Sequence, residues 1–136
     1  MKCPTNAHVA LVDGETFRIF RNKGALFEPR LEAETTPDLH RTNYSAAVRK
    51  HDDVGQELGR TDLDELAHGA AAAEWLNERA IAGDLQDVII IADPKTLGEM
   101  RRHYHTELES RVVGEIDKTL TGQSAEQIER AIASAE

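Results

Sequence analysis

Acidic side chains follow two short apolar runs of this sequence, at positions from which they could bind a metal ion. Asp13 follows the run at 9–12, and Asp93 follows the run at 88–92. If these runs are neighbouring parallel strands, both carboxylates leave the sheet at its carboxyl edge, where open α/β sheets bind ligands. Clustered carboxylates of this kind hold Mg²⁺ in metal-dependent nucleases.

Each of these carboxylates also has a purely structural interpretation. Asp13-Gly14 is typical of a hairpin turn, and Asp93-Pro94 is typical of a helix start, with Asp as the cap and Pro at the first position. Further acids could join them from a helix and from the end of a later strand: Asp62, Asp64 or Glu65, and Asp117. We favour the structural interpretation and expect neither a metal site nor another cofactor.

Two basic clusters are candidates for binding an anionic group. The first is Arg49-Lys50-His51 with Arg60, and the second is Arg101-Arg102-His103 with Arg111. Local cations on an acidic protein can bind a phosphate or an acidic partner. The alternative is that they are solvated and paired with nearby glutamates. The candidate binding residues are Arg49, Lys50, Arg60, Arg101 and Arg102.

The first third of the chain predicts three short antiparallel strands joined by turns, at residues 9–12, 16–21 and 25–32. Pro29 cannot donate a ladder hydrogen bond, so we expect the third strand at a sheet edge. Between about 33 and 60 no apolar period is sustained. This predicts a long loop, which is either functional or disordered.

The rest of the chain predicts alternating helices and strands. Helical spacing of apolar residues begins after Thr61 or Asp62 and stops at Gly83, a typical helix C-terminal residue. The run at 87–92 is β-branched without polar alternation, as in a strand buried on both faces. Three further elements complete the order: a helix capped by Asp93 and running to Leu108, a strand at 112–116, and a helix opened by Ser124 with Gln127.

These elements predict a single α/β domain over residues 1–136. Strand–helix–strand units require parallel pairing with right-handed crossovers. We therefore expect three layers, with a mixed five-stranded sheet in the order 3-2-1-4-5 and helices on both faces, a ribonuclease H-like topology. Four apolar side chains are expected to be buried between the sheet and the helices: Leu66, Leu76, Ile90 and Val113.

Composition limits the classes of function. The 136 residues include 16 Lys or Arg and 25 Asp or Glu, which gives a net charge of −9. This balance argues against strong nucleic-acid binding, which needs many phosphate-neutralising cations, and against docking on an anionic membrane. A single cysteine, Cys3, excludes an intramolecular disulfide and a cysteine-rich zinc site. No targeting segment or membrane span is recognisable, so we expect a cytoplasmic protein.

Three segments resemble the bacterial family of proteins required for attachment to host cells. They are His-Val-Ala-Leu-Val-Asp at 8–13, Asp-Pro-Lys-Thr-Leu-Gly-Glu-Met-Arg at 93–101, and Arg-Val-Val-Gly-Glu-Ile-Asp-Lys-Thr-Leu-Thr at 111–121. The resemblance covers nearly the whole chain. It departs in the central loop, which is variable and rich in Gly and Ser in that family.

That family is similar in layout to the middle domain of archaeal and eukaryotic class I translation release factors. Those domains carry Gly-Gly-Gln in the long loop after the third strand, where the glutamine positions a water that hydrolyses peptidyl-tRNA. The corresponding place here holds Val54-Gly55-Gln56. Val54 replaces the first glycine, and valine does not easily adopt the positive φ that glycine allows.

The resemblance leaves two main functions open. The favoured one is a non-enzymatic binding or interaction module, whose loop and basic clusters meet an unknown protein or ribosome-associated partner. The alternative is a release-factor-like peptidyl-tRNA hydrolase that acts on ribosomes through Gly55 and Gln56. A ribonuclease H-like metal nuclease is a third, less favoured possibility. Val54 and the net acidity favour the binding module.

Overall fold

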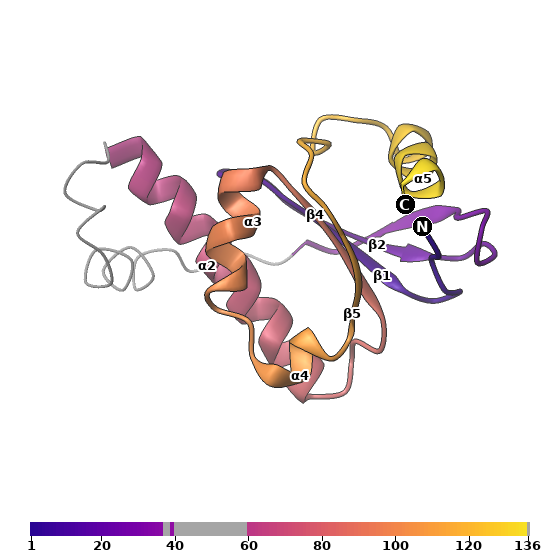
Figure 1. Cartoon of the computed structure of the whole chain (residues 1–136), viewed down its shortest axis with the longest axis horizontal. Coiled ribbons are helices and arrows are strands. Elements are labelled where there is room, and N and C mark those ends of the chain that lie inside the picture. The colour runs from indigo at the N-terminus through magenta and orange to yellow at the C-terminus, as the bar shows by residue number, and fades with distance from the viewer. Residues whose placement is uncertain (37–38, 40–59, 136) are drawn as a thin grey trace.

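The computed structural model of the chain describes residues 1–36, 39 and 60–135, apart from the side chains of 60–62. Its strands are β1 (His8–Val12), β2 (Phe17–Asn22), β3 (Leu31–Glu34), β4 (Val88–Ala92) and β5 (Val112–Ile116). Its helices are α2 (Arg60–Ile81), α3 (Pro94–Arg101), α4 (Thr106–Glu109) and α5 (Ala125–Ser134). Figure 1 shows their arrangement.

The five strands form one mixed sheet in the order β3-β2-β1-β4-β5, which confirms the predicted order. β2 runs antiparallel to β1 and β3, whereas β4 pairs in parallel with β1 and β5. Four strands therefore run in one direction, toward an edge that we call the carboxyl edge. The likeness to ribonuclease H stays a prediction.

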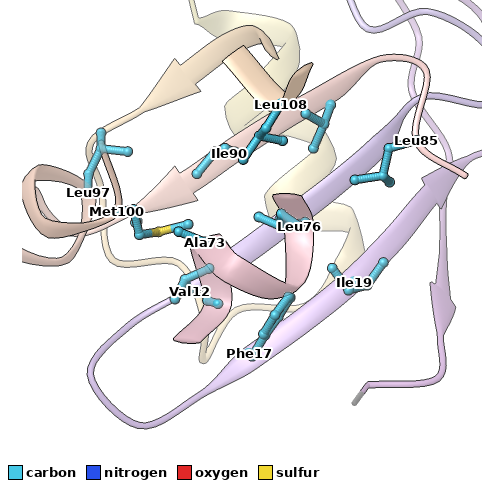
Figure 2. Packing of buried hydrophobic residues seen from close by; sticks show 14 of the residues in the cluster. Val12, Phe17, Ile19, Ala73, Leu76, Leu85, Ile90, Leu97, Met100 and Leu108 are labelled. Carbon is cyan, nitrogen blue, oxygen red and sulfur yellow. The ribbon is translucent and has the colours of Figure 1, made fainter. Parts of the chain in front are cut away.

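Helices cover both faces of the sheet, as expected for three layers. Figure 1 shows α2, α3 and α4 on one face and α5 on the other. Along β1 the side chains alternate between two cores, with Ala10 and Val12 beneath α2 and α3 and Val9 and Leu11 beneath α5. Figure 2 shows the first core, in which strand residues meet apolar side chains of α2 and α3. This period of two follows from the pleat of the strand.

Two of the four predicted core residues are confirmed and two are corrected. Leu76 and Ile90 are fully buried, whereas Leu66 is only half-buried. The prediction for Val113 is wrong, because 43% of this residue is exposed. β5 lies at the sheet edge, and Val88 pairs with Val112 while the next β4 residue pairs with Gly114. Val113 therefore lies in a β-bulge without a partner residue on β4.

The third strand begins later than the sequence predicts, at Leu31 rather than at 25. The fully buried Asn22 explains the shift. Its side-chain Oδ1 accepts hydrogen bonds from the backbone N–H groups of Gly24 (2.8 Å) and Arg30 (2.9 Å). These bonds hold residues 23–30 in a wide turn that takes the place of strand pairing. The strand is nevertheless at the sheet edge, as Pro29 predicts.

The helix predicted to run from Asp93 to Leu108 is broken into α3 and α4. Asn77 of α2 causes the break, because its Nδ2 donates to the carbonyl of His103 (2.7 Å) and its Oδ1 accepts from the N–H of His105 (2.9 Å). His105 then caps α4, as its Nδ1 accepts from the N–H of Glu107 (3.0 Å). Leu108 still reaches the core, but from α4.

Replacing Asn77 with leucine should destabilise the fold. The substitution leaves the carbonyl of His103 and the N–H of His105 without their partner, and each buried unsatisfied group costs about 1–3 kcal/mol. Glu78→Leu is the matched control, because Glu78 is exposed on the same helix. Urea denaturation of both variants measures the difference. Equal stability of Asn77→Leu and Glu78→Leu would refute the role of this clamp.

Helix ends largely follow the signals in the sequence. α2 ends before Gly83, which has a φ of +84°. Ser124 and Gln127 form a complete capping box at the start of α5. α2 begins at Arg60, slightly before Thr61. Within the described part of the chain, no helix has the length and apolarity needed to cross a membrane.

Candidate functional site

The carboxyl edge is approached by the two elements that flank the central segment of the chain, β3 and α2. β3 runs toward this edge, and α2 contacts it through Glu65 and His68, so segment 35–59 connects two elements that approach the edge. Leu39, within this segment, packs against the core beneath α2 and α3. The candidate hydrolytic pair belongs to the same segment by its place in the sequence.

Three contacts fix the first turns of α2 at this edge. The ring Nδ1 of His68 lies 2.7 Å from the backbone oxygen of Asp13, and Lys95 Nζ lies 3.1 Å from Glu65 Oε2. Glu65 also packs against Gly14, where a Cβ would lie 2.3 Å from Glu65 Cγ. Gly14 is therefore required for this close approach of the turn to the helix.

A second set of contacts fixes the end of β3, where the central segment begins. Glu34 Oε1 lies 3.2 Å from His8 Nε2, and its Oε2 lies 3.5 Å from Arg21 Nε. Burial lowers the pKa of His8 below its ordinary value, and the attraction to Glu34 only partly opposes this. Arg21 Nη2 lies 3.1 Å from the same Nε2 and also lowers the pKa of His8, so His8 is expected to be neutral at neutral pH, between Glu34 and Arg21.

Asp13 holds the turn after β1 and links it to the segment that follows β5. Its Oδ1 accepts from the backbone N–H groups of Glu15 (2.7 Å) and Thr16 (2.6 Å), and its Oδ2 accepts from the hydroxyl of Thr121 (2.5 Å). Burial raises the pKa of Asp13, but these hydrogen bonds outweigh burial and bring the pKa below its ordinary value. Asp13 is thus an ionised clamp with both oxygens engaged.

Thr121→Val should destabilise the protein in a pH-dependent way. A hydrogen bond to a charged group contributes about 1.5–3 kcal/mol. Because the pKa of Asp13 is depressed in the folded state, this contribution is complete well above the ordinary carboxyl pKa of about 3.9 and is lost as the pH falls through the folded value. Denaturant unfolding of both proteins at several pH values measures it. A difference that stays constant down to the acid limit would contradict this role of Asp13.

Arg18 of β2 also contacts the segment that follows β5. Its Nη1 donates to the carbonyls of Thr121 (2.9 Å) and Gln123 (3.1 Å), so the segment after β5 returns over the edge to β2. Sequence reasoning missed Arg18 and Thr121. No local pattern signals either residue, because their partners lie more than one hundred positions away along the chain.

Asp13 and Asp93 line one shallow pocket of about 250 Å³, together with Gly14, Glu15 and Glu65. This confirms the expectation that the two aspartates meet at one edge. Asp93 caps α3, since its Oδ2 accepts from the backbone N–H of Thr96 (3.1 Å). Among the side chains that the structure describes, which exclude that of Asp62, no group of three or more His, Cys, Asp or Glu could hold a metal ion. Here the carboxylates act as a clamp and a cap.

The second basic cluster is paired with acidic side chains of its own surface. Arg101 donates to Glu115 Oε1 from both Nε (3.2 Å) and Nη2 (2.9 Å), and Arg102 Nη1 lies 3.4 Å from Glu99 Oε1. Tyr104 donates its hydroxyl to Glu115 Oε2 (2.8 Å), and burial raises its pKa above the ordinary value. A partner that binds Arg101 or Arg102 must compete with these pairs.

The other candidate residues fall at or beyond the limits of the described chain. Gly55, Gln56, Arg49 and Lys50 lie outside the described residues. Arg60 is the first residue of α2, and its side chain is not described. The proposed hydrolytic pair and the first basic cluster therefore remain predictions from the sequence.

Comparison with known proteins decides the family. Residues 6–132 match the model of the bacterial archaeo-eukaryotic release factor family 12. The chain belongs to this family. The match runs from just before β1 into α5 and so includes all five strands. No curated protein matches the chain.

Family membership confirms the release-factor part of the resemblance read from the sequence. The host-attachment name stays a prediction. In the sequence, Gly55-Gln56 lies in the segment between β3 and α2. The clamps of Asp13, Glu34 and Glu65 hold the two elements that flank this segment in place.

Proposed function

We propose that this member of the release-factor family acts on peptidyl-tRNA bound to ribosomes in the cytoplasm and promotes hydrolysis of its ester bond. Gly55 and Gln56 are the proposed catalytic residues. The observation that carries the proposal is family membership over residues 6–132. The Gly-Gln dipeptide lies between β3 and α2, after the third strand, where release factors carry their hydrolytic loop.

The chemistry assigned to Gln56 is positioning rather than proton transfer. A glutamine amide has one acceptor oxygen and two N–H donors and does not titrate near neutral pH. It can therefore orient a water for attack on the ester carbonyl but cannot act as a general base. Holding a nucleophile in the attacking geometry removes part of the entropic barrier. The contacts at the carboxyl edge would hold β3 and α2 in fixed positions, so that the segment between them can be directed toward the ester bond.

A non-enzymatic binding module is the second proposed function, and Val54 is the observation that favours it. Valine replaces the first glycine of the release-factor motif, which restricts the backbone before Gly55. In this case the domain binds a ribosome-associated or other protein partner without releasing peptide. The candidate contacts are Arg49, Lys50, Arg60, Arg101 and Arg102. A role in host attachment would then act through such a partner.

Co-sedimentation with ribosomes tests the ribosomal part of the proposal. The purified chain is centrifuged with ribosomes through a sucrose cushion at low and at moderate salt. We expect co-migration at low salt that weakens as salt rises, because the contacts of an acidic protein with RNA are local and screened. Absence from the ribosome pellet under both conditions would contradict a ribosomal function.

A further inference from the structure

The turn between β2 and β3 carries the most exposed large apolar side chain among the described residues. Phe27 is 63% exposed and its neighbour Leu26 is 37% exposed. Figure 1 shows this turn at the opposite end of the molecule from the start of α2. We call residues 23–30 together with Lys2 the hairpin tip. The tip is therefore remote from the carboxyl edge and its candidate hydrolytic segment.

The hairpin tip is held rigidly although its surface is exposed. The Nδ2 of Asn22 donates to the carbonyl of Cys3 (2.8 Å), while its Oδ1 accepts from Gly24 and Arg30 as described above. The N–H of Cys3 donates to the carbonyl of Leu26 (2.9 Å), which places Lys2 beside the turn. These bonds fix the backbone around Phe27, so little conformational entropy remains to be lost when a partner binds.

The cations of the hairpin tip differ from most others of the described structure. Lys2, Lys23 and Arg30 are exposed, and none forms an ion pair with a described residue. Elsewhere six cations pair with carboxylates: Arg21, Arg79, Lys95, Arg101, Arg102 and Arg111. Within the tip, the only acid is Glu28, and at its edge Glu129 Oε2 of α5 accepts from the backbone N–H of Leu31 (2.7 Å). The tip thus carries more cations than acids, together with an exposed aromatic side chain, on an acidic protein.

We propose that the hairpin tip binds single-stranded RNA, with Phe27 stacking on an unpaired base and Lys2, Lys23 and Arg30 contacting phosphates. Aromatic side chains among cations are how proteins hold unpaired nucleotides, because every base offers a π-face. The choice of RNA rests on the proposed ribosomal function, since ribosomal RNA displays unpaired loops.

The small apolar area of the tip favours RNA over an anionic membrane. Insertion into a bilayer needs a large apolar face, and the tip offers only two large exposed apolar side chains, Leu26 and Phe27. The net charge of −9 repels either partner, but at about 0.1 M salt charges beyond about 10 Å are largely screened. We therefore expect a weak contact that depends on local cations.

Fluorescence anisotropy with a labelled oligouridylate of about 12 nucleotides, near the upper end of known site sizes, tests this inference. We expect wild type to bind and Phe27→Ala to weaken binding about tenfold, the effect of losing one stacked base. Lys23→Gln should reduce the slope of log affinity against log salt by about 0.7, as expected for one lost phosphate contact.

Two matched variants control for loss of an apolar or a charged group elsewhere. Ile81 is 58% exposed on α2, and Lys118 is exposed beyond β5, so Ile81→Ala and Lys118→Gln should bind as wild type does. No binding by wild type, or equal binding by Phe27→Ala, would overturn the inference. Binding to phosphatidylserine vesicles in place of the oligonucleotide would overturn it in favour of a membrane. The assay contains no peptidyl-tRNA. A negative result would therefore overturn RNA binding by the tip, whereas the proposed hydrolysis is tested separately by peptide release.

Discussion

Ile90→Asp should leave the chain unable to fold. Ile90 is fully buried in β4, an interior strand of the sheet, and its side chain packs beneath α2 and α3. An aspartate there must either bury a charge without a partner or take up a proton, at a cost of several kcal/mol. Domains of this size are stable by about 5–15 kcal/mol in total, so this single change removes much of that margin. Circular dichroism and urea denaturation measure the outcome.

Val113→Asp is the matched control for this experiment. Val113 belongs to the neighbouring strand β5, but it is 43% exposed in the bulge at the sheet edge. A carboxylate at this position stays solvated, and exposed substitutions change stability by about 0.5 kcal/mol or less. A soluble Ile90→Asp variant that unfolds cooperatively, as Val113→Asp should, would contradict the three-layer core.

The order of the strands could be predicted because it follows from local patterns and one chirality rule. The apolar run of β4 indicated a strand covered on both faces, and Pro29 indicated an edge strand. Right-handed crossovers then left the order that the structure shows. The bulge at Val113 could not be predicted, because it depends on how β5 registers with β4 rather than on the sequence of β5 alone.

Two further differences between the predicted and the observed elements have the same cause. In each, a buried asparagine side chain forms hydrogen bonds to backbone groups outside its own strand or helix. Asn22 bonds to backbone groups of the turn and of the N-terminal segment, and so delays β3. Asn77 bonds to the link between α3 and α4, and so ends α3 early. A sequence reveals that an amide is present but not which distant carbonyl it will reach. Predictions from local residue propensities therefore placed the start of β3 and the end of α3 wrongly.

The candidate site was predictable only in its local parts. Asp13 and Asp93 were expected at one edge of the sheet, and both line the same pocket there. The hydrogen bonds that define the role of Asp13 come partly from Thr121, whose hydroxyl approaches only once the sheet has formed. The sequence alone could not decide whether Asp13 binds a metal ion or stabilises a turn. In the structure both of its carboxylate oxygens accept hydrogen bonds, which favours the role in the turn.

Gln56→Ala should abolish release of peptide from ribosomal peptidyl-tRNA. Loss of the amide removes the group that would orient the attacking water, and groups that position reactants can contribute several powers of ten to a rate. Alanine retains the backbone, so thermal stability should stay at the wild-type value. Val54→Gly should raise the rate of release, because glycine restores the backbone freedom that valine denies.

Release of labelled peptide from purified ribosomal complexes carrying peptidyl-tRNA tests the central proposal most directly. We expect release by the wild-type chain, little or none by Gln56→Ala at equal ribosome binding, and faster release by Val54→Gly. Equal rates for wild type and Gln56→Ala, or no release by wild type at saturating protein, would contradict the hydrolytic function.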